Sequence, residues 1–323
     1  MLVLVAPGQG AQTPGFLTPW LDLPGAADRL GAWSDVTGLD LVRLGTKADA
    51  EEIRDTAVAQ PLLVAGALLS AAALFDRAVS GGAVASAPRE AVGAVAGHSV
   101  GELAAASLAG TLTEHDAMAL VRRRAEAMAE AAAVTKTGMS AVLGGDPAEV
   151  AARLDALGLT AANNNGGGQI VAAGTMEQLA ALAADKPDKA RVLPLKVAGA
   201  FHTSHMAPAV AAMAEAAGQV GVADPVIPFV SNADGEVVTE GQEIVRRLVS
   251  QVSHPVRWDL CMETFQQLGA TALIELCPAG TLAGLAKRNL PGVARVAVKT
   301  PDNLAEAREL IAAQAAEAAE QEH

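Results

Sequence analysis

The sequence predicts an α/β fold in which a large domain with a parallel sheet is interrupted by a smaller inserted subdomain. Two observations support this class. Apolar stretches typical of buried strands alternate with helical stretches, and one segment in the middle of the chain has a self-contained order of elements before the alternation resumes. A chain of 323 residues can hold both units, because single hydrophobic cores stop growing near roughly 250 to 300 residues.

The first predicted strand lies at the N-terminus and ends in the glycine-rich turn Pro7-Gly-Gln-Gly-Ala-Gln12. Because the glycines of this turn have no side chains, its backbone N–H groups can approach a ligand closely. The pattern then predicts a helix over residues 60–79, a buried strand over 91–97 and a helix over 102–110 that Gly110 ends. After the insertion, strands are expected near 227–232, 272–278 and 294–299.

The insertion is predicted from six elements in the order β-α-β-β-α-β, which is the ferredoxin-like order. They are a strand over 138–144, a helix over 146–157, strands over 159–164 and 169–174, a helix over 176–185 and a strand over 190–196. We therefore assign residues 1–130 and 198–310 to the core domain and 131–197 to the insertion. Residues 311–323 lose apolar periodicity and are expected to fray.

Composition excludes several classes of function. A net charge of −13 argues against general nucleic-acid binding, which needs a basic surface. The two cysteines, Cys261 and Cys277, lack the spacing of a metal or redox motif and are expected to be buried. The N-terminus does not resemble a secretion signal, and no uninterrupted apolar run reaches the roughly 18 residues of a membrane span. We expect a monomeric cytoplasmic protein that binds no membrane.

The segment Gly97-His-Ser-Val-Gly101 has the G-x-S-x-G form, in which a sharp strand-to-helix turn exposes a serine hydroxyl. The predicted strand before it and helix after it supply the context that this motif requires. The start of the helix also offers unpaired backbone N–H groups to an oxyanion, Val100 first. The alternative is a glycine-flanked serine in an ordinary turn.

A serine nucleophile needs a base, and a histidine is the expected one. His98 adjoins Ser99, but the tight turn directs neighbouring side chains apart, so a structural hydrogen bond is the better interpretation. His202 and His205 are better placed, at a strand-to-helix junction after the insertion, and spacing does not choose between them. The other histidines are His115 in the first turn of a helix, His254, and His323 at the end of the tail.

A helix is predicted from Thr113 to about residue 131, and Arg124 falls on its apolar stripe whereas Arg122 and Arg123 point away. A buried guanidinium is costly unless it is paired. Arg124 therefore either bonds an internal Asp or Glu, or receives a carboxylate from outside. The nearby Ser99 favours a substrate carboxylate.

Six ordered motifs together resemble the acyltransferase family of fatty-acid and polyketide synthesis, and within it the stand-alone malonyl-CoA:acyl-carrier-protein transacylases. The resemblance covers nearly the whole chain. The motifs are Pro7-Gly-Gln-Gly-Ala-Gln12, Gly97-His-Ser-Val-Gly-Glu102, Arg124 followed by Met128, Asn163-Asn-Asn165 before Gly168-Gln-Ile-Val171, Gly199-Ala-Phe-His202 and Gln251-Val-Ser-His-Pro-Val-Arg-Trp258.

The resemblance implies an α/β-hydrolase-like core with a ferredoxin-like insertion. It implies that Ser99 is the nucleophile and His202 the base, with the backbone carbonyl of Gln251 orienting the imidazole. Further implied roles are an oxyanion hole for the backbone N–H groups of Gln9 and Val100, and a bidentate contact from Arg124 to a malonyl carboxylate.

The same resemblance implies a substrate pocket formed by Phe201, Met128 and Asn163. Phe201 stands where the family's malonyl-selective members have a bulky residue that leaves no room for a 2-methyl branch. Val100, which follows the serine, indicates the same selectivity. This sequence departs from the family's H-A-F-H pattern at Gly199, which weakens that expectation.

The implied reaction moves a malonyl group from malonyl-CoA to an acyl carrier protein through a malonyl-serine ester, with no metal or other cofactor. An acidic carrier protein would need a local basic patch, for which the candidates are Lys186, Lys189, Arg191, Lys196, Lys287 and Arg288. The alternatives are a carrier protein of polyketide synthesis, a serine esterase or thioesterase, and a binding module that keeps only the fold.

Overall fold

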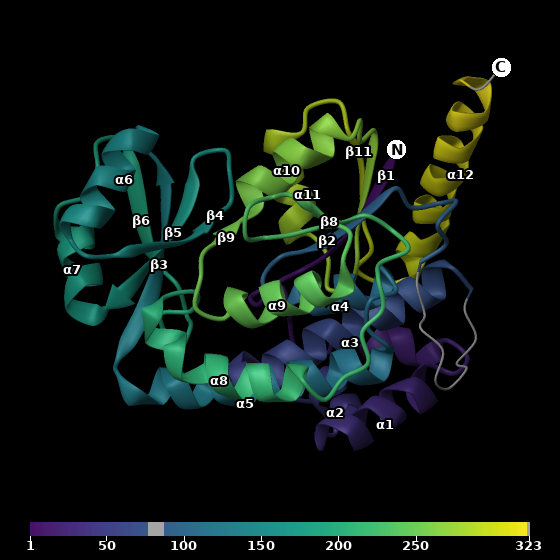
Figure 1. Ribbon diagram of the computed structural model, residues 1–323, viewed down its shortest axis with the longest axis horizontal. Coiled ribbons are helices and arrows are strands. Elements are labelled where there is room, and N and C mark those ends of the chain that lie inside the picture. The colour runs from purple at the N-terminus through teal and green to yellow at the C-terminus, as the bar shows by residue number, and fades with distance from the viewer. Residues whose placement is uncertain (77–86, 322–323) are drawn as a thin grey trace.

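The computed structural model describes residues 1–76 and 87–321, which form two β-sheets with helices packed around them (Figure 1). The larger sheet has the strand order β11-β10-β1-β2-β7-β8, and the smaller sheet has the order β6-β3-β5-β4-β9. The predicted mixed α/β class is therefore confirmed.

The larger sheet is parallel except at one edge. Its parallel strands are β1 (Leu2–Ala6), β2 (Ala94–Gly97), β7 (Phe229–Val230), β10 (Ala272–Glu275) and β11 (Ala294–Ala297), and β8 (Val237–Val238) runs antiparallel to β7. Alternate side chains of β1 enter two different cores, with Leu2 and Leu4 on one face and Val3 and Val5 on the other. Because both faces are covered, the sequence of this strand is uniformly apolar.

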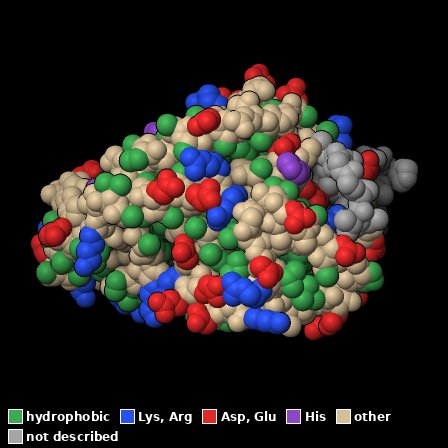
Figure 2. Space-filling model, turned by 90° about the horizontal axis from the view of Figure 1, so that it is seen from below, with side chains coloured by type: hydrophobic (Ala, Val, Ile, Leu, Met, Phe, Trp, Pro, Cys, Tyr) green, Lys and Arg blue, Asp and Glu red, His purple; other side chains and the backbone are tan. Residues whose placement is uncertain are grey.

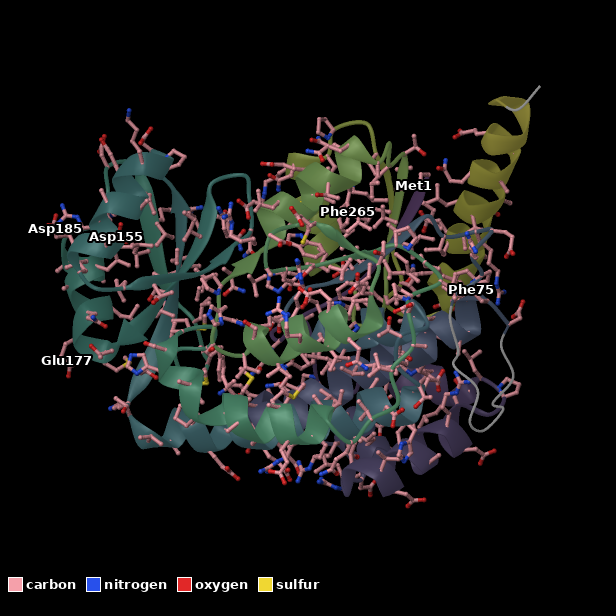
Figure 3. All side chains as sticks on the ribbon, in the orientation of Figure 1. Met1, Phe75, Asp155, Glu177, Asp185 and Phe265 are labelled. Carbon is pink, nitrogen blue, oxygen red and sulfur yellow. The ribbon has the colours of Figure 1, made fainter. Side chains whose placement is uncertain are left out.

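Helices form both covering layers of the larger sheet. One core contains residues of α1 (Ala26–Thr37), α2 (Leu41–Thr46), α3 (Thr56–Leu74), α4 (Gly101–Leu108), α5 (Glu114–Val134), α8 (Ala207–Ala217), α9 (Gly241–Gln251) and α12 (Leu304–Gln321). The other core lies under α10 (Trp258–Gln267) and α11 (Thr281–Asn289), where Phe265 is fully buried (Figure 3).

Helix α3 has the length and hydropathy of a membrane span, with 19 residues, but 83% of its most apolar window is buried inside the fold. It is packed as a core helix. It begins at Thr56 rather than at residue 60, because the carboxylate of Asp55 caps it by accepting from the backbone N–H of Ala57 at 2.8 Å. It ends at Leu74, where Phe75 forms the C-cap, and so does not continue to the predicted residue 79. Residues 77–79 lie outside the described residues.

The insertion has its elements in the predicted order. They are β3 (Thr137–Gly144), α6 (Pro147–Ala156), β4 (Thr160–Asn164), β5 (Gln169–Thr175), α7 (Met176–Ala184) and β6 (Ala190–Pro194). Its four strands pair antiparallel and bury a separate small core that includes Val142, Leu154 and Leu182. The remaining strand of this sheet, β9 (Val256–Arg257), comes from the core domain and pairs with β4.

Two further sequence expectations need correction. Helix α5 continues to Val134, so the boundary expected at residue 131 falls inside a run of helix-forming alanines. The strand expected at 227–232 is limited to Phe229–Val230, because Ser231 begins a turn in which its carbonyl accepts from Gly235 N–H at 2.9 Å. Residues up to Gln321 belong to helix α12, in which Gln314 accepts from the amino group of Met1 at 3.2 Å, and the expected fraying of the tail over 311–323 stays a prediction.

The carboxyl ends of β1, β2 and β7 meet at one edge of the larger sheet, because these strands are parallel neighbours. The loops that follow them carry Gln9, Ser99 and Asn232, respectively. In open α/β sheets this edge is where ligands bind. The topology thus brings three segments that are remote in sequence to a single site.

Candidate active site

Ser99 lies in a sharp turn between β2 and α4 with a left-handed backbone, φ 55°. The flanking glycines permit the turn, because a Cβ at Gly97 would overlap the backbone of Gly101 and a Cβ at Gly101 would overlap the carbonyl of Ala6. Gly8 is needed for a similar reason, since a Cβ there would lie 2.8 Å from the carbonyl oxygen of His98. The three glycines allow the loop after β1 to pack directly on the turn.

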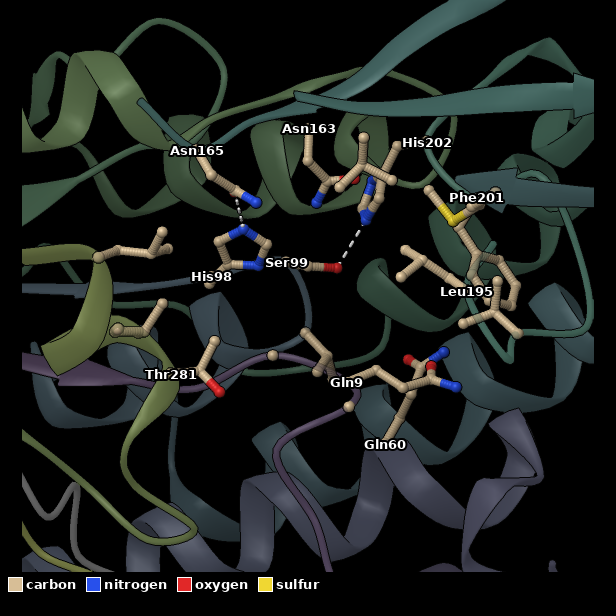
Figure 4. A pocket seen from close by; sticks show the side chains of 18 of the residues that line it. Gln9, Gln60, His98, Ser99, Asn163, Asn165, Leu195, Phe201, His202 and Thr281 are labelled. Atoms are coloured by element: carbon tan, nitrogen blue, oxygen red, sulfur yellow. Dashed lines mark hydrogen bonds between the residues drawn. The ribbon is translucent and has the colours of Figure 1, made fainter. Parts of the chain in front are cut away.

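The Ser99 hydroxyl is hydrogen-bonded to His202, with 2.6 Å between Oγ and Nε2 (Figure 4). The other ring nitrogen, Nδ1, lies 2.8 Å from the backbone carbonyl oxygen of Gln251. A carbonyl only accepts, so Nδ1 carries the proton and Nε2 is left to accept from the serine hydroxyl. The geometry therefore fixes the tautomer that can remove a proton from Ser99.

His202 is buried, and burial lowers its pKa to about 3, with the positive charge of Arg124 adding to the effect. The hydrogen bond to Gln251 opposes the shift. Because this pKa lies below the ordinary 6.5, the imidazole is neutral at physiological pH. The ring is thus held in the form of a base.

Arg124 is 2% exposed and its guanidinium points toward the nucleophile. Nη1 donates to Oε1 of Gln60 at 2.5 Å, and Nη2 donates to Oε1 of Gln251 at 2.8 Å and to Ser99 Oγ at 3.4 Å. Burial lowers its pKa to about 10, so the group remains charged near neutral pH. In the described part of the chain, its hydrogen-bond partners are two neutral amides and the serine, rather than an internal Asp or Glu.

A buried acidic side chain, Glu102, is connected to Arg124 through the side-chain amide of Gln251. Its Oε2 accepts a short hydrogen bond from Nε2 of Gln251, and its Oε1 accepts from the backbone N–H of Asn232 at 2.6 Å. Burial raises the pKa of Glu102 to about 8, against the lowering effect of the Asn232 bond and of Arg124. Both oxygens accept from N–H donors, so the Gln251 amide links the carboxyl group of Glu102 to the guanidinium.

A cavity of about 260 Å³ opens above Ser99 and is walled by both domains. Eight of the nine predicted site residues line it, namely Ser99, His202, Gln9, Val100, Arg124, Phe201, Met128 and Asn163, and Gln251 lies behind it against Arg124 and His202. In Figure 4, Gln9 and Asn163 lie on opposite sides of the Ser99 hydroxyl. The structure thus brings all nine residues together.

Of the other described histidines, His98 also lines the cavity, but its ring is not hydrogen-bonded to the serine. His98 is half-buried, with Nε2 2.8 Å from Oδ1 of Asn165 and its ring edge-on to Trp258, and desolvation lowers its pKa. It is a structural hydrogen-bonding residue, as predicted. His115 and His254 are exposed, His205 is outside the cavity lining, and His323 lies beyond the described residues.

Three residues of this network are absent from the predicted site: Gln60, Glu102 and Asn232. Gln60 could be suspected as a polar side chain in the apolar run that forms α3. Asn232 follows the strand next to β2, but the sequence does not reveal strand order. Glu102 ends the motif Gly97-His-Ser-Val-Gly-Glu102, yet its contacts with Gln251 and Asn232 span 149 and 130 positions, respectively.

Comparison with known proteins is consistent with this geometry. The family described as "Acyl transferase domain" matches residues 3–305. The malonyl CoA-acyl carrier protein transacylase of Mycobacterium tuberculosis (strain ATCC 25618 / H37Rv) is 53% identical over 306 residues, which are 95% of this chain and 99% of that protein.

Solved structures give the same result. The crystal structure of MCAT from Mycobacterium tuberculosis matches with a TM-score of 0.89 and 53% identity, covering 95% of this chain and 99% of the other. A malonyl-transacylase in complex with a type II PKS acyl-carrier protein matches with a TM-score of 0.85 and 29% identity over 95% and 99% of the two chains. The family match spans nearly the whole chain, so this chain belongs to the acyl transferase domain family and is an acyltransferase.

Proposed function

We propose that this acyltransferase moves a malonyl group from malonyl-CoA to the phosphopantetheine thiol of an acyl carrier protein, by way of a malonyl ester on Ser99. The observation that carries the proposal is the buried guanidinium of Arg124, which points at a serine hydrogen-bonded to a neutral histidine. The names of the relatives support it, since the 53% identical protein is called a malonyl CoA-acyl carrier protein transacylase.

In the first half-reaction, Ser99 Oγ attacks the thioester carbonyl and its proton passes to Nε2 of His202. The Gln251 carbonyl, 2.8 Å from Nδ1, stabilises the imidazolium that forms. The carbonyl oxygen becomes an oxyanion, which the backbone N–H groups of Gln9 and Val100 receive. The C–S bond then breaks, and CoA leaves as a thiol with the proton from His202.

In the second half-reaction, the carrier-protein thiol gives its proton to His202 and attacks the malonyl-serine ester. Ser99 leaves with that proton, so the enzyme is regenerated. Side chains and backbone groups of the chain supply each proton and charge, and the proposed cycle therefore includes no metal or other cofactor.

Arg124 selects an acyl group that carries a second carboxylate. The two amide oxygens on its Nη atoms, from Gln60 and Gln251, hold the fork in the orientation in which a malonyl carboxylate can bind both. A hydrogen bond to a charged group is worth about 1.5–3 kcal/mol. An acetyl group has no second carboxylate and makes no such contact. We therefore predict that malonyl is preferred over acetyl by about 10- to 100-fold or more.

Phe201, Met128 and Asn163 form the wall of the cavity that would exclude a branched acyl group. The departure at Gly199 has a packing reason, because a Cβ at that position would lie 2.7 Å from the Cβ of Ala132 on α5. Gly199 therefore allows the strand-to-helix junction to pack closely against α5. We propose that Phe201 keeps its selective role.

The finer fold assignment is also proposed. We assign the larger domain to the α/β-hydrolase-like class, supported by the serine turn at the carboxyl edge of a parallel sheet. The insertion is assigned to the ferredoxin-like class, supported by its β-α-β-β-α-β order and the strand order β6-β3-β5-β4. A cytoplasmic location and service to fatty-acid synthesis belong to the same proposal, with polyketide carrier proteins as the alternative.

The principal prediction concerns Arg124. Mixed with malonyl-CoA and quenched, the wild type should gain one malonyl group by intact mass, and Ser99→Ala should gain none. In Arg124→Ala the rate of malonyl loading should fall about 100-fold while acetyl loading changes less than tenfold. Arg123→Ala is the matched control, because that side chain is 42% exposed and pairs with Glu126 at 3.7 Å on the surface.

Two outcomes would contradict this assignment. Release of free malonate without an adduct would favour a hydrolase, and equal loading of acetyl and malonyl by the wild type would remove the role of Arg124. Circular dichroism of each variant checks that the fold is retained.

The pKa of His202 predicts an unusual pH dependence. Since the folded-state pKa is about 3, the base stays available down to that pH, and the rate of Ser99 acylation should change less than about threefold between pH 7 and 5. A base with the ordinary pKa of 6.5 would lose about tenfold per unit below it. The measurement is quenched-flow acylation by malonyl-CoA, and a fall that follows a pKa near 6.5 would refute the assignment.

The lowered pKa of His202 also makes the free energy of unfolding depend on pH. The unfolded chain binds a proton at His202 below its ordinary pKa of about 6.5 and the folded chain does not, so acidification from 6.5 toward 3 lowers the free energy of unfolding. The acylation assay therefore includes a circular dichroism control at each pH.

The candidate basic residues for a carrier protein are all exposed, but they differ in position. Arg288 donates to Oε1 of Gln169 at 3.0 Å, and Gln169 lines the cavity. Lys196 lies between Leu195 and Val197, which also line it. Lys186 follows Asp185, which projects at the outer end of the insertion (Figure 3).

Charges of both signs are interspersed on the face in Figure 2, so the acidic net charge does not give a uniformly acidic surface there. We expect Lys196→Glu and Arg288→Glu to raise the KM for an acidic carrier protein about fivefold or more at low salt, without changing malonyl-CoA loading. Lys186→Glu is the control. Equal KM values for the three variants and the wild type would place docking elsewhere.

A further inference from the structure

Asn232 lies in the loop after β7, where its side chain is completely buried against the nucleophile turn. Its Oδ1 accepts from the backbone N–H of Ser99 at 2.8 Å, and its Nδ2 donates to the carbonyl of Gly97 at 2.8 Å. One amide group therefore bridges the last residue of β2 and the nucleophile itself.

This bridge stabilises an unfavourable backbone conformation in the turn. Ser99 has a φ of 55°, a conformation that is unfavourable for a residue with a side chain and persists only when its surroundings enforce it. In that conformation the Ser99 N–H points away from the β2 ladder toward the loop after β7. Asn232 supplies its acceptor and holds the carbonyl two residues earlier at the same time.

Asn232 is itself held by Glu102, whose Oε1 accepts from the Asn232 backbone N–H at 2.6 Å. The second oxygen of Glu102 accepts from Nε2 of Gln251, which also donates to the Ser99 carbonyl at 3.0 Å. Both backbone polar groups of Ser99 are thus fixed by side chains that converge on Glu102. The Gln251 backbone, in turn, orients His202.

We propose that Asn232, fixed by Glu102, is a positioning residue of the transfer reaction that holds Ser99 in its strained backbone and its hydroxyl in line with His202. It contacts no substrate and acts through the nucleophile turn. The inference rests on the proposed role of Ser99 as nucleophile.

The test compares Asn232→Ala with Ser70→Ala. The control makes the same type of defect elsewhere, because Ser70 Oγ accepts from the buried backbone N–H of Cys277 at 3.1 Å and lies outside the cavity lining. Two rates are measured for the full-length chain: malonyl loading from malonyl-CoA, and labelling of Ser99 by a fluorophosphonate, which requires an oriented serine but no carboxylate contact.

In Asn232→Ala we expect both rate constants to fall about 10- to 100-fold at saturation while the KM for malonyl-CoA changes less than about threefold, because the nucleophile moves and Arg124 does not. Ser70→Ala should keep both rates within about twofold. Glu102→Gln, which keeps the volume but replaces one acceptor by a donor toward Gln251, should slow labelling less than Asn232→Ala does. If Asn232→Ala does not fold, labelling of Glu102→Gln still tests the proposal.

Wild-type rates in Asn232→Ala, or equal losses in Asn232→Ala and Ser70→Ala, would overturn the proposal, as would a Glu102→Gln enzyme with wild-type labelling. These outcomes differ from a failure of the proposed function, in which the wild type itself would form no malonyl adduct on Ser99.

Discussion

The structure of the site depends on the hydrogen bond between Ser99 and His202, which joins residues 103 positions apart. Both residues have left-handed backbones, with φ values of 55° and 61°. Neither conformation is favourable for a side-chain-bearing residue by itself. The close approach of the loops after β1, β2 and β7 enforces the first, and packing of the junction after the insertion beside Gln251 enforces the second.

Electrostatics adds a second constraint, because the site holds a buried cation beside a base. The charge of Arg124 and the burial of the ring act on His202 in the same direction, and both keep it neutral. The buried guanidinium is stabilised by hydrogen bonds to neutral amides and, through Gln251, by the carboxyl group of Glu102. A direct ion pair would occupy both Nη atoms, whereas amide oxygens leave the positive charge for a substrate.

Much of this arrangement is encoded locally. The turn at Ser99 is predicted by its flanking glycines, the inward direction of Arg124 by helical periodicity, and the insertion by turn and strand signals close to the observed boundaries. The choice of His202 over His205 rests on resemblance, because the two histidines are only three positions apart and sequence spacing does not distinguish them. Asn232 and Glu102 could not be predicted, since their contacts depend on which strands are neighbours. Two-residue strands such as β8 and β9 are set by tertiary pairing alone.

The central claim is that Arg124 holds the carboxylate of an acyl group bound to Ser99, and a crystal structure of the malonyl-loaded enzyme tests it most directly. We predict an ester on Ser99 Oγ with the malonyl carboxylate about 3 Å from both Nη atoms of Arg124, and with the amide of Gln60 or Gln251 displaced or sharing the site. An acyl group on another residue would contradict the claim. So would a malonyl carboxylate directed to solvent while Arg124 keeps its bonds to both glutamines.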